Sequence, residues 1–258
     1  MTYQGPILEA EGITKKFGGL VAVDEVSFSV SLGKIKALIG PNGAGKSTAL
    51  NMLSGVYHPT SGRIRVKGRE VTRLGGAHHF ARIGVARTFQ TVQLFGNMTV
   101  VENVMMGLHI KGRSSMFSGA FRLPSVVREE RKVFGQAMGR LAEVGLAARA
   151  QEIATNLPFG QQRLLEIARA IAGEPQVLLL DEPAAGLSMT ETESLAEMIQ
   201  KIRDLGIGVL VVDHDMRLIM DISDEVVVLD HGKKIAEGTP REVQTNPAVI
   251  SAYLGEDL

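Results

Sequence analysis

The stretch GPNGAGKST, residues 40–48, decides the fold of this chain. It fits the pattern G-x-x-x-x-G-K-[ST], with Gly40, Gly45, Lys46 and Ser47 at the fixed positions. Glycines let backbone N–H groups curl around phosphate oxygens, the lysine adds a positive charge, and the serine hydroxyl can bind Mg²⁺. The run KIKALIG at 34–40 reads as a strand that leads into the glycine loop, and KSTALNMLSG at 46–55 reads as a helix. A bare glycine turn has no need of Lys-Ser-Thr at this point, so we predict a phosphate-binding loop between a strand and a helix.

Composition limits the classes of function that the chain can have. It has 258 residues, with 28 Lys and Arg against 28 Asp and Glu, and no cysteine. The zero net charge gives no electrostatic argument for nucleic acid as a partner. The lack of cysteine excludes disulfides and thiolate metal sites and fits a reducing compartment.

Neither a signal peptide nor a membrane span is expected. The first residues, MTYQGPILEAEG, lack a basic segment followed by an apolar one. The longest apolar runs, such as VLLL at 177–180, fall far short of the roughly 20 residues that span a bilayer. We therefore expect a soluble chain, which can still reach a membrane by docking to a protein that spans it.

The hydrophobic pattern changes along the chain and indicates how it is organised. Short alternating segments near the start, such as VSFSV at 26–30, predict strands of an antiparallel edge. Residues 91–165 carry few strand signals and a Gly/Ser-rich interruption at 112–125, which predicts a helical subdomain with a mobile loop. Buried strands then alternate with helices, as in a parallel sheet with right-handed crossovers. We expect one α/β domain over 1–258, with its ligand at the carboxyl ends of the strands.

Polar residues follow two of these strands. Asp181 ends the apolar run VLLL and Glu182 comes next. A phosphate loop needs a carboxylate on a neighbouring strand to help hold Mg²⁺, and a second acid there is well placed to polarise a water molecule. His214 follows the strand GVLVV and falls at the same sheet edge as Lys46. The alternatives are a solvated acidic turn before Pro183 and a purely structural histidine.

Six motifs then occur in a fixed order: GPNGAGKST, RTFQ, LPFGQQRLLEIARAI, LLLDEP, AGLS and DHD. In this order they resemble the nucleotide-binding subunit of an ABC transporter, over nearly the whole chain. The resemblance implies a P-loop NTPase domain of the ABC type, with a parallel core sheet, an antiparallel β edge and an α-helical subdomain. It also implies an ATPase that uses ATP and Mg²⁺.

The same resemblance implies roles for single residues. Glu182 would act as the catalytic base, with Lys46, His214 and Gln90 of RTFQ as further catalytic residues. Gln90 would also sense metal and water and link to the transmembrane partner, although RTFQ could be mere loop packing. The Mg²⁺ ligands would be Ser47, Gln90 and Asp181. The residues that bind ATP in the same subunit would be Phe17 in KKFGG, which stacks on adenine unless it is an ordinary core ring, and Asn42, Gly43, Gly45, Lys46, Ser47 and Thr48.

The segment LPFGQQR, residues 157–163, departs from the family pattern. The family usually has L-S-G-G-Q here, which caps the γ-phosphate of ATP bound to the other subunit of a head-to-tail dimer. Phe159, Gly160 and Gln161 would therefore bind ATP in trans. Pro158 replaces the serine and has no N–H to offer. We expect a helix beginning at Gly160 to hold the anion through its backbone N–H groups and a partial charge of about +0.5, more weakly than usual; the alternative is a capped core helix.

A second departure is AGLS at 185–188. The family usually has aspartate at the last position, and Ser188 keeps a hydrogen-bonding group but loses the charge. The feature that this puts in doubt is communication between the two nucleotide sites.

Two longer segments narrow the choice within the family. ARTFQTVQLFGNMTVVENVMMG and the tail EGTPREVQTNPAVISAYLGE resemble the ATP-binding subunits of branched-chain amino acid importers, the LivG-like group. The resemblance implies transmembrane permease subunits as partners, a second ATP-binding subunit, identical or different, and indirectly a solute-binding protein outside the membrane. It implies a cytoplasmic place on the inner face of the membrane, reached through the permease, and no nucleic acid partner.

Three other interpretations remain open. Non-transport ABC proteins that act on ribosomes or DNA usually carry two nucleotide domains or a long coiled-coil or zinc insertion, and these 258 residues hold neither. A subunit of the lipopolysaccharide-transport type is close in sequence but usually keeps a serine and two glycines in the signature. A regulatory ATP sensor without hydrolysis would be expected to lack Glu182.

Overall fold

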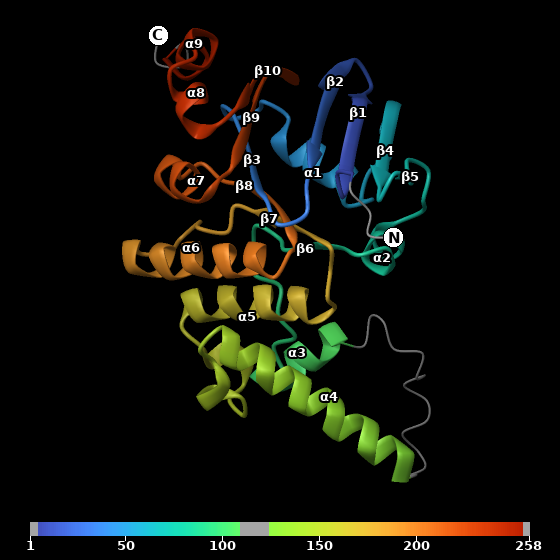
Figure 1. The fold of residues 1–258 in the computed structure, drawn as a ribbon, viewed down its shortest axis with the longest axis vertical. Coiled ribbons are helices and arrows are strands. Elements are labelled where there is room, and N and C mark those ends of the chain that lie inside the picture. Colours follow the sequence, from blue (N-terminus) through green and yellow to red (C-terminus); the bar gives the residue numbers. More distant parts are fainter. Residues whose placement is uncertain (1–4, 109–123, 255–258) are drawn as a thin grey trace. The chain divides into compact units, whose positions relative to one another are not determined.

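The computed structural model in Figure 1 describes residues 5–108 and 124–254. The chain divides into two compact units, one formed by residues 1–90 and 176–258 and the other by Thr91–Pro175. The range 91–165, expected from the sequence for a helical subdomain, is shorter than this second unit. Residues 112–123 of the expected mobile loop lie outside the described part, and Pro124 already begins a helix.

A six-stranded sheet forms the centre of the first unit, in the order β10-β9-β3-β8-β7-β6. Its strands are β3 Ile35–Ile39, β6 Val85–Arg87, β7 Val177–Asp181, β8 Gly208–Val212, β9 Glu225–Asp230 and β10 Lys233–Gly238. All neighbours pair in parallel except β10, which runs antiparallel to β9. Every residue of β3, β7 and β8 is buried, as expected for strands covered on both faces. The predicted parallel core sheet is confirmed.

A four-stranded antiparallel sheet, in the order β2-β1-β4-β5, belongs to the same unit. Its strands are β1 Leu8–Phe17, β2 Leu20–Val30, β4 Ser61–Val66 and β5 Arg69–Glu70. Strands β4 and β5 turn at Lys67 and Gly68, both with positive φ, the conformation that a tight two-residue hairpin turn requires. The predicted antiparallel edge is confirmed as well.

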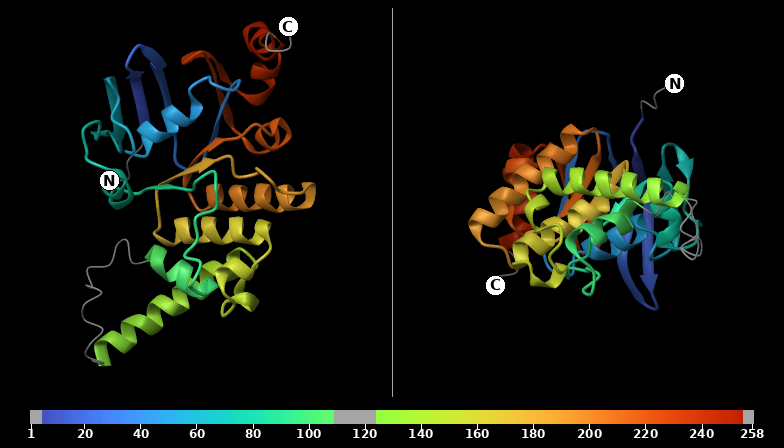
Figure 2. Two further views of the ribbon diagram at one scale, coloured as in Figure 1. Left: turned by 180° about the vertical axis from the view of Figure 1, so that it is seen from behind. Right: turned by 90° about the horizontal axis from the view of Figure 1, so that it is seen from below.

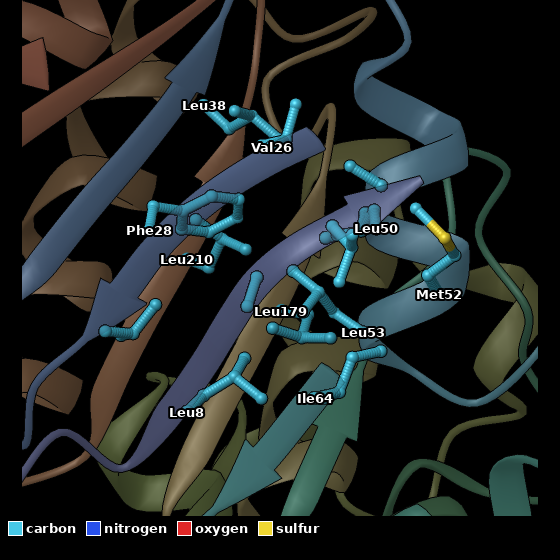
Figure 3. Close-up of a cluster of buried hydrophobic side chains, with 14 of the residues drawn as sticks. Leu8, Val26, Phe28, Leu38, Leu50, Met52, Leu53, Ile64, Leu179 and Leu210 are labelled. Atoms are coloured by element: carbon cyan, nitrogen blue, oxygen red, sulfur yellow. The ribbon is translucent and has the colours of Figure 1, made fainter. Parts of the chain in front are cut away.

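Both sheets contribute to a hydrophobic core of the first unit. Figures 1 and 2 show helix α1, Lys46–Leu53, and the antiparallel sheet on one side of the parallel sheet, with α6, Met189–Asp204, and α7, Met216–Ile222, on the other. The side chains that fill the space around α1 come from all three elements (Figure 3): Leu8, Val26, Phe28 and Ile64 from the antiparallel sheet, Leu50, Met52 and Leu53 from α1, and Leu38, Leu179 and Leu210 from the parallel sheet.

Short helices complete the first unit: α2 Ala77–Arg82, α8 Pro240–Gln244 and α9 Pro247–Leu254. Ser188 begins α6 with a capping box. Its hydroxyl accepts from the backbone N–H of Glu191 at 3.4 Å, and the Glu191 carboxylate accepts from the backbone N–H of Ser188 at 2.9 Å. The hydroxyl in AGLS is therefore used to start a helix.

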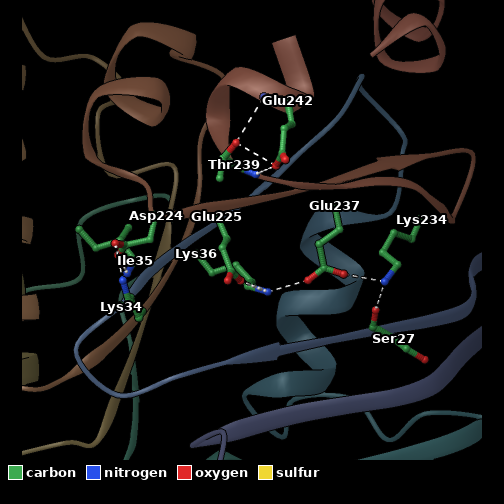
Figure 4. A network of polar contacts seen from close by, with 10 residues as sticks. All are labelled: Ser27, Lys34, Ile35, Lys36, Asp224, Glu225, Lys234, Glu237, Thr239 and Glu242. Carbon is green, nitrogen blue, oxygen red and sulfur yellow. Dashed lines mark hydrogen bonds and ion pairs between the residues drawn. The ribbon is translucent and has the colours of Figure 1, made fainter. Parts of the chain in front are cut away.

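A polar network links the β9–β10 hairpin to strand β3 (Figure 4). The buried ammonium of Lys36 lies 2.6 Å from a Glu237 carboxylate oxygen and 2.7 Å from one of Glu225. Lys234 donates to the other oxygen of Glu237 at 2.7 Å and to the carbonyl of Ser27. Burial raises the pKa of Glu237, but the hydrogen bonds and the charges of both lysines outweigh it, so the pKa lies below its usual 4.5.

Replacing Glu237 with glutamine is expected to lower the free energy of unfolding at pH 7 by about 1–3 kcal/mol, because two charged hydrogen bonds are weakened. The folded-state pKa lies below the unfolded value, so this contribution is present above pH 4.5 and is lost as the pH falls below it. Urea unfolding of parent and variant at a series of pH values measures it. A gap between the two proteins that stays constant down to the acid limit would contradict the expectation.

The second unit is helical. Its elements are α3 Val100–Leu108, α4 Pro124–Glu143, two short 3-10 helices at Ala147–Arg149 and Ala154–Asn156, and α5 Phe159–Ala172. Helices α3 and α5 approach closely at Gly107, where a Cβ would lie 2.1 Å from the carbonyl oxygen of Arg169. A larger residue at this point would force the helices apart. Within the described ranges, no helix combines the length and the apolar character needed to cross a membrane.

Candidate active site

The loop at residues 40–45 links β3 to α1 and requires glycine at two positions. Gly40 has φ 148°, and a Cβ there would lie 2.0 Å from the carbonyl oxygen of Leu229. Gly45, with φ 99°, precedes α1, and its Cβ would lie 2.4 Å from the carbonyl oxygen of Ala22. The loop is therefore pressed between β9 and β2, and its path is open only to residues without a side chain.

Polar groups follow one another along this loop and the first turn of α1. The ammonium of Lys46 donates to the carbonyl oxygens of Gly40 and Pro41 at 2.6 and 2.8 Å, so it lies over the loop itself. Asn42, Gly43 and Ser47 are exposed, and Thr48 is half-buried. Since α1 starts at Lys46, the backbone N–H groups of its first turn have no partner within the helix and face the loop. Together these groups form a cradle suited to phosphate.

Asp181, at the end of β7, is held by an arginine that the sequence pattern did not single out. Arg87 ends β6, and its guanidinium donates to Asp181 Oδ2 at 2.9 Å, to Asn51 Oδ1 at 2.6 Å and to Ser54 Oγ at 2.8 Å. The side chains of Arg87 and Asp181 are each 10% exposed. One buried cation thus ties the predicted metal carboxylate to the helix that follows the phosphate loop. In the sequence, the only sign of a role for Arg87 was that it is the first residue of the motif RTFQ.

Two further predicted catalytic residues, Gln90 and His214, lie close to the carboxylate of Glu182. The side-chain amide of Gln90 donates to Glu182 Oε2 at 2.9 Å, and Nδ1 of His214 lies 3.9 Å from the same oxygen. The His214 ring is 72% exposed, so it is accessible to a ligand. The backbone of Glu182 has φ 44°, a left-handed conformation that costs a non-glycine residue about 1–2 kcal/mol. Such strain in an acid at a strand end is typical of functional sites.

Phe17, at the end of β1, shares its surroundings with a second aromatic ring. It is 43% exposed and meets Tyr57 edge-on at a centroid distance of 5.5 Å. The ammonium of Lys15 lies 5.2 Å from the Phe17 ring centre and donates to the carbonyl of His58. Phe17 is therefore a surface ring that can stack on a planar ligand, and the alternative of a core ring is wrong. Tyr57 carried no sequence signal.

The signature segment lies in the second unit. Helix α5 begins at Phe159, one residue before the predicted start, and Pro158 takes the N-cap position without a side-chain cap. Phe159 is exposed, Gly160 buried and Gln161 half-buried. The Gln162 side chain donates to the carbonyl of Leu157 at 2.8 Å, which steadies the turn into the helix. The N-terminal N–H groups of α5 are the groups available for an anion.

A buried ion pair lies inside α5. Arg163 donates to Glu166 Oε2 at 2.8 Å, and each side chain is 1% exposed. The other oxygen of Glu166 accepts the backbone N–H of Gln93 at 3.1 Å. Burial raises the pKa of Glu166, while Gln93 and Arg163 act against this. Glu166 therefore fastens the stretch that follows Gln90 in the sequence onto the signature helix.

Comparison with known protein families shows which family the chain belongs to. The family described as ABC transporter matches residues 23–185, more than half of the chain. The chain belongs to the ABC transporter family. A second family, described as branched-chain amino acid ATP-binding cassette transporter, matches residues 233–258. As an ABC transporter subunit with this cassette, the chain is an ATPase.

Individual ABC proteins are similar along their whole length. The high-affinity branched-chain amino acid transport ATP-binding protein BraF of Pseudomonas aeruginosa is 47% identical over 252 residues, 97% of this chain and 98% of the relative. LivG of Escherichia coli is 44% identical with the same coverage. The ADP conformation of MJ1267, an ATP-binding cassette of an ABC transporter, gives a TM-score of 0.84 at 32% identity, covering 98% of this chain and all of that one. The predicted fold of the ABC type is thereby confirmed.

Proposed function

We propose that this chain hydrolyses ATP to power the uptake of branched-chain amino acids through a membrane permease. The observation that carries the hydrolytic part is the meeting of Gln90 and His214 at one carboxylate oxygen of Glu182, next to Asp181. The amino acid part is supported by the similarity to BraF and LivG, whose names state that transport.

In the proposed reaction the phosphates of ATP lie against the loop at 40–45 and Lys46, and adenine stacks on Phe17. A water molecule attacks the γ-phosphorus, and the carboxylate of Glu182 accepts its proton as the new P–O bond forms. The bond to the β-phosphate oxygen breaks, and ADP and phosphate result. Gln90 orients the water, and His214 contacts the γ-phosphate. Backbone N–H groups and Lys46 stabilise the negative charge on the phosphates.

Ser47 and Asp181 fit a magnesium ion. Mg²⁺ usually takes one or two protein ligands and completes its shell with substrate phosphates and water. Ser47 and Asp181 would hold the ion, with Gln90 beside them, and when bound the ion supplies positive charge to the phosphates.

The signature segment is proposed to bind ATP held by a second ATP-binding subunit. Pro158→Ser is expected to raise ATP affinity or the ATPase rate about two- to tenfold, because a hydroxyl adds one hydrogen bond to a charged phosphate. ATP titration and steady-state hydrolysis measure both quantities. Pro158→Ala is the matched control, since it restores the N–H without the hydroxyl. Unchanged affinity and rate in the serine variant would remove the proposed contact.

The transport part of the proposal places the chain on the cytoplasmic face of the membrane, bound to permease subunits that receive solute from a binding protein outside. Cells that lack the chain, but keep the permease and binding protein, test it through the uptake of radiolabelled leucine. The parent chain should restore uptake, and the Glu182→Gln chain should not. Equal uptake with and without the parent chain would overturn the amino acid assignment and leave the ATPase standing.

A further inference from the structure

Asp213, the residue before His214, is a buried carboxylate that three backbone N–H groups surround. Its side chain is fully buried. Oδ2 accepts the N–H of Ala184 at 2.9 Å, and Oδ1 accepts those of His214 and Asp215 at 2.8 and 2.9 Å. A carboxylate is costly to bury unless it is hydrogen-bonded, and bonds to a charged acceptor are stronger than neutral ones. These three bonds therefore define where the carboxylate lies.

The two oxygens of Asp213 connect different loops. Oδ1 binds within its own loop, after β8, and thereby shapes the turn that presents His214. Oδ2 reaches across to Ala184, in the loop after β7 that carries Glu182. The side chain thus joins the backbone beside the proposed base to the backbone of the proposed phosphate-contacting histidine.

Two hydrogen bonds hold the strained backbone at Glu182, one at the residue itself and one two residues later. Its own N–H donates to the carbonyl of Val212 at 2.7 Å, and two residues later the N–H of Ala184 donates to Asp213. A left-handed glutamate persists only where its surroundings hold it. Here both holding acceptors belong to the neighbouring residues Val212 and Asp213.

We propose that Asp213 is a positioning residue for ATP hydrolysis. It keeps Glu182 in its left-handed conformation and sets the distance from the Glu182 carboxylate to the His214 ring. This inference rests on the proposed roles of Glu182 and His214. Asp213 acts through the backbone and takes no part in binding the nucleotide, whose cradle is formed by the loop at 40–45 and Lys46.

The variant Asp213→Asn separates the hydrogen bonds within the His214 loop from the hydrogen bond to Ala184. The variant has the same shape, but only one of its two terminal atoms can accept a hydrogen bond. The amide oxygen will face the two donors of its own loop, which leaves the NH₂ group opposite the N–H of Ala184. The turn at His214 is kept, and the bond to the Glu182 loop is lost.

The test compares steady-state ATP hydrolysis, nucleotide affinity and melting temperature of the full-length parent and Asp213→Asn chains. We expect kcat to fall about 10- to 100-fold, as for a misplacement of reacting groups by about 1 Å. KM for ATP and the nucleotide affinity should stay within about twofold, because the phosphate cradle is untouched. Asp215→Asn is the matched control: Asp215 caps α7, and asparagine caps a helix equally well, so its kcat should match the parent.

Three results would overturn the inference: a parental kcat in Asp213→Asn, a loss that appears as weaker nucleotide binding with kcat unchanged, or an equal loss in Asp215→Asn. If the asparagine variant does not fold, Asp213→Ser replaces it. A serine hydroxyl can accept a hydrogen bond from its own loop but is too short to reach Ala184, and the same outcomes apply.

Glu182→Gln in the same assay tells the two proposals apart. If it hydrolyses like the parent, the proposed catalytic role fails; if it is inactive while Asp213→Asn is normal, only the role of Asp213 fails.

Discussion

Replacing Glu182 with glutamine is expected to lower the ATPase rate by about 10²–10⁴-fold, the usual contribution of a general base. The amide keeps the shape of the side chain and can still hydrogen-bond to Gln90, but it cannot accept the proton of the attacking water. ATP binding should persist, because the phosphate loop and Phe17 are unchanged, and ATP should then hold two chains together in a stable dimer. Phosphate release, ATP titration and size-exclusion chromatography with ATP measure these three properties.

Glu25 offers a matched control for this substitution. It is also a glutamate with a left-handed backbone, φ 51°, but it lies exposed on β2 of the antiparallel sheet. Glu25→Gln makes the same chemical change on the same kind of backbone and should hydrolyse ATP like the parent. Hydrolysis at the parental rate by Glu182→Gln would show that another group accepts the proton.

Replacing Arg87 with methionine is expected to cause the largest loss of stability, about 3–5 kcal/mol. The substitution removes the cation that compensates Asp181 and leaves a nearly buried carboxylate without its partner. The side chains of Asn51 and Ser54 lose the same donor. For a chain of this size the melting temperature should fall by roughly 10 °C, as measured by calorimetry without nucleotide.

Arg65→Met is the control for this prediction. Arg65 pairs with Glu11 at 2.6 Å, but both side chains are about one third exposed. An exposed pair of this kind contributes less than about 1 kcal/mol, so the variant should melt close to the parent. Equal melting temperatures for the parent and Arg87→Met would show that Asp181 does not depend on the guanidinium.

Much of the fold could be predicted because its central strands are runs of mostly apolar residues. In β3, β7 and β8 every residue is buried, so the strands stand out in the sequence without any alternation. Strand β6 and helix α2 were missed. They span only Val85–Arg87 and Ala77–Arg82, too few residues for a period to emerge, and β6 is a strand because it pairs with β7.

The sequence motifs predict which residues form the site, but not the contacts that arrange them. Lys46, Asp181, Glu182 and His214 stand at recognisable places, but the contacts that arrange them do not. Arg87 reaches Asp181 across 94 positions of sequence, and Asp213 reaches Ala184 across 29. Such bonds depend on which strands become neighbours. The left-handed backbone of Glu182 is set by the same neighbours, and no pattern of residue types encodes it.

The cap at Ser188 bears on how members of this family can diverge. Serine and aspartate start a helix about equally well, so α6 would form with either residue. Exchange between the two is therefore close to neutral for folding, although it adds or removes a full negative charge. A change between the two residues can therefore leave the fold intact while it alters the charge at the start of α6.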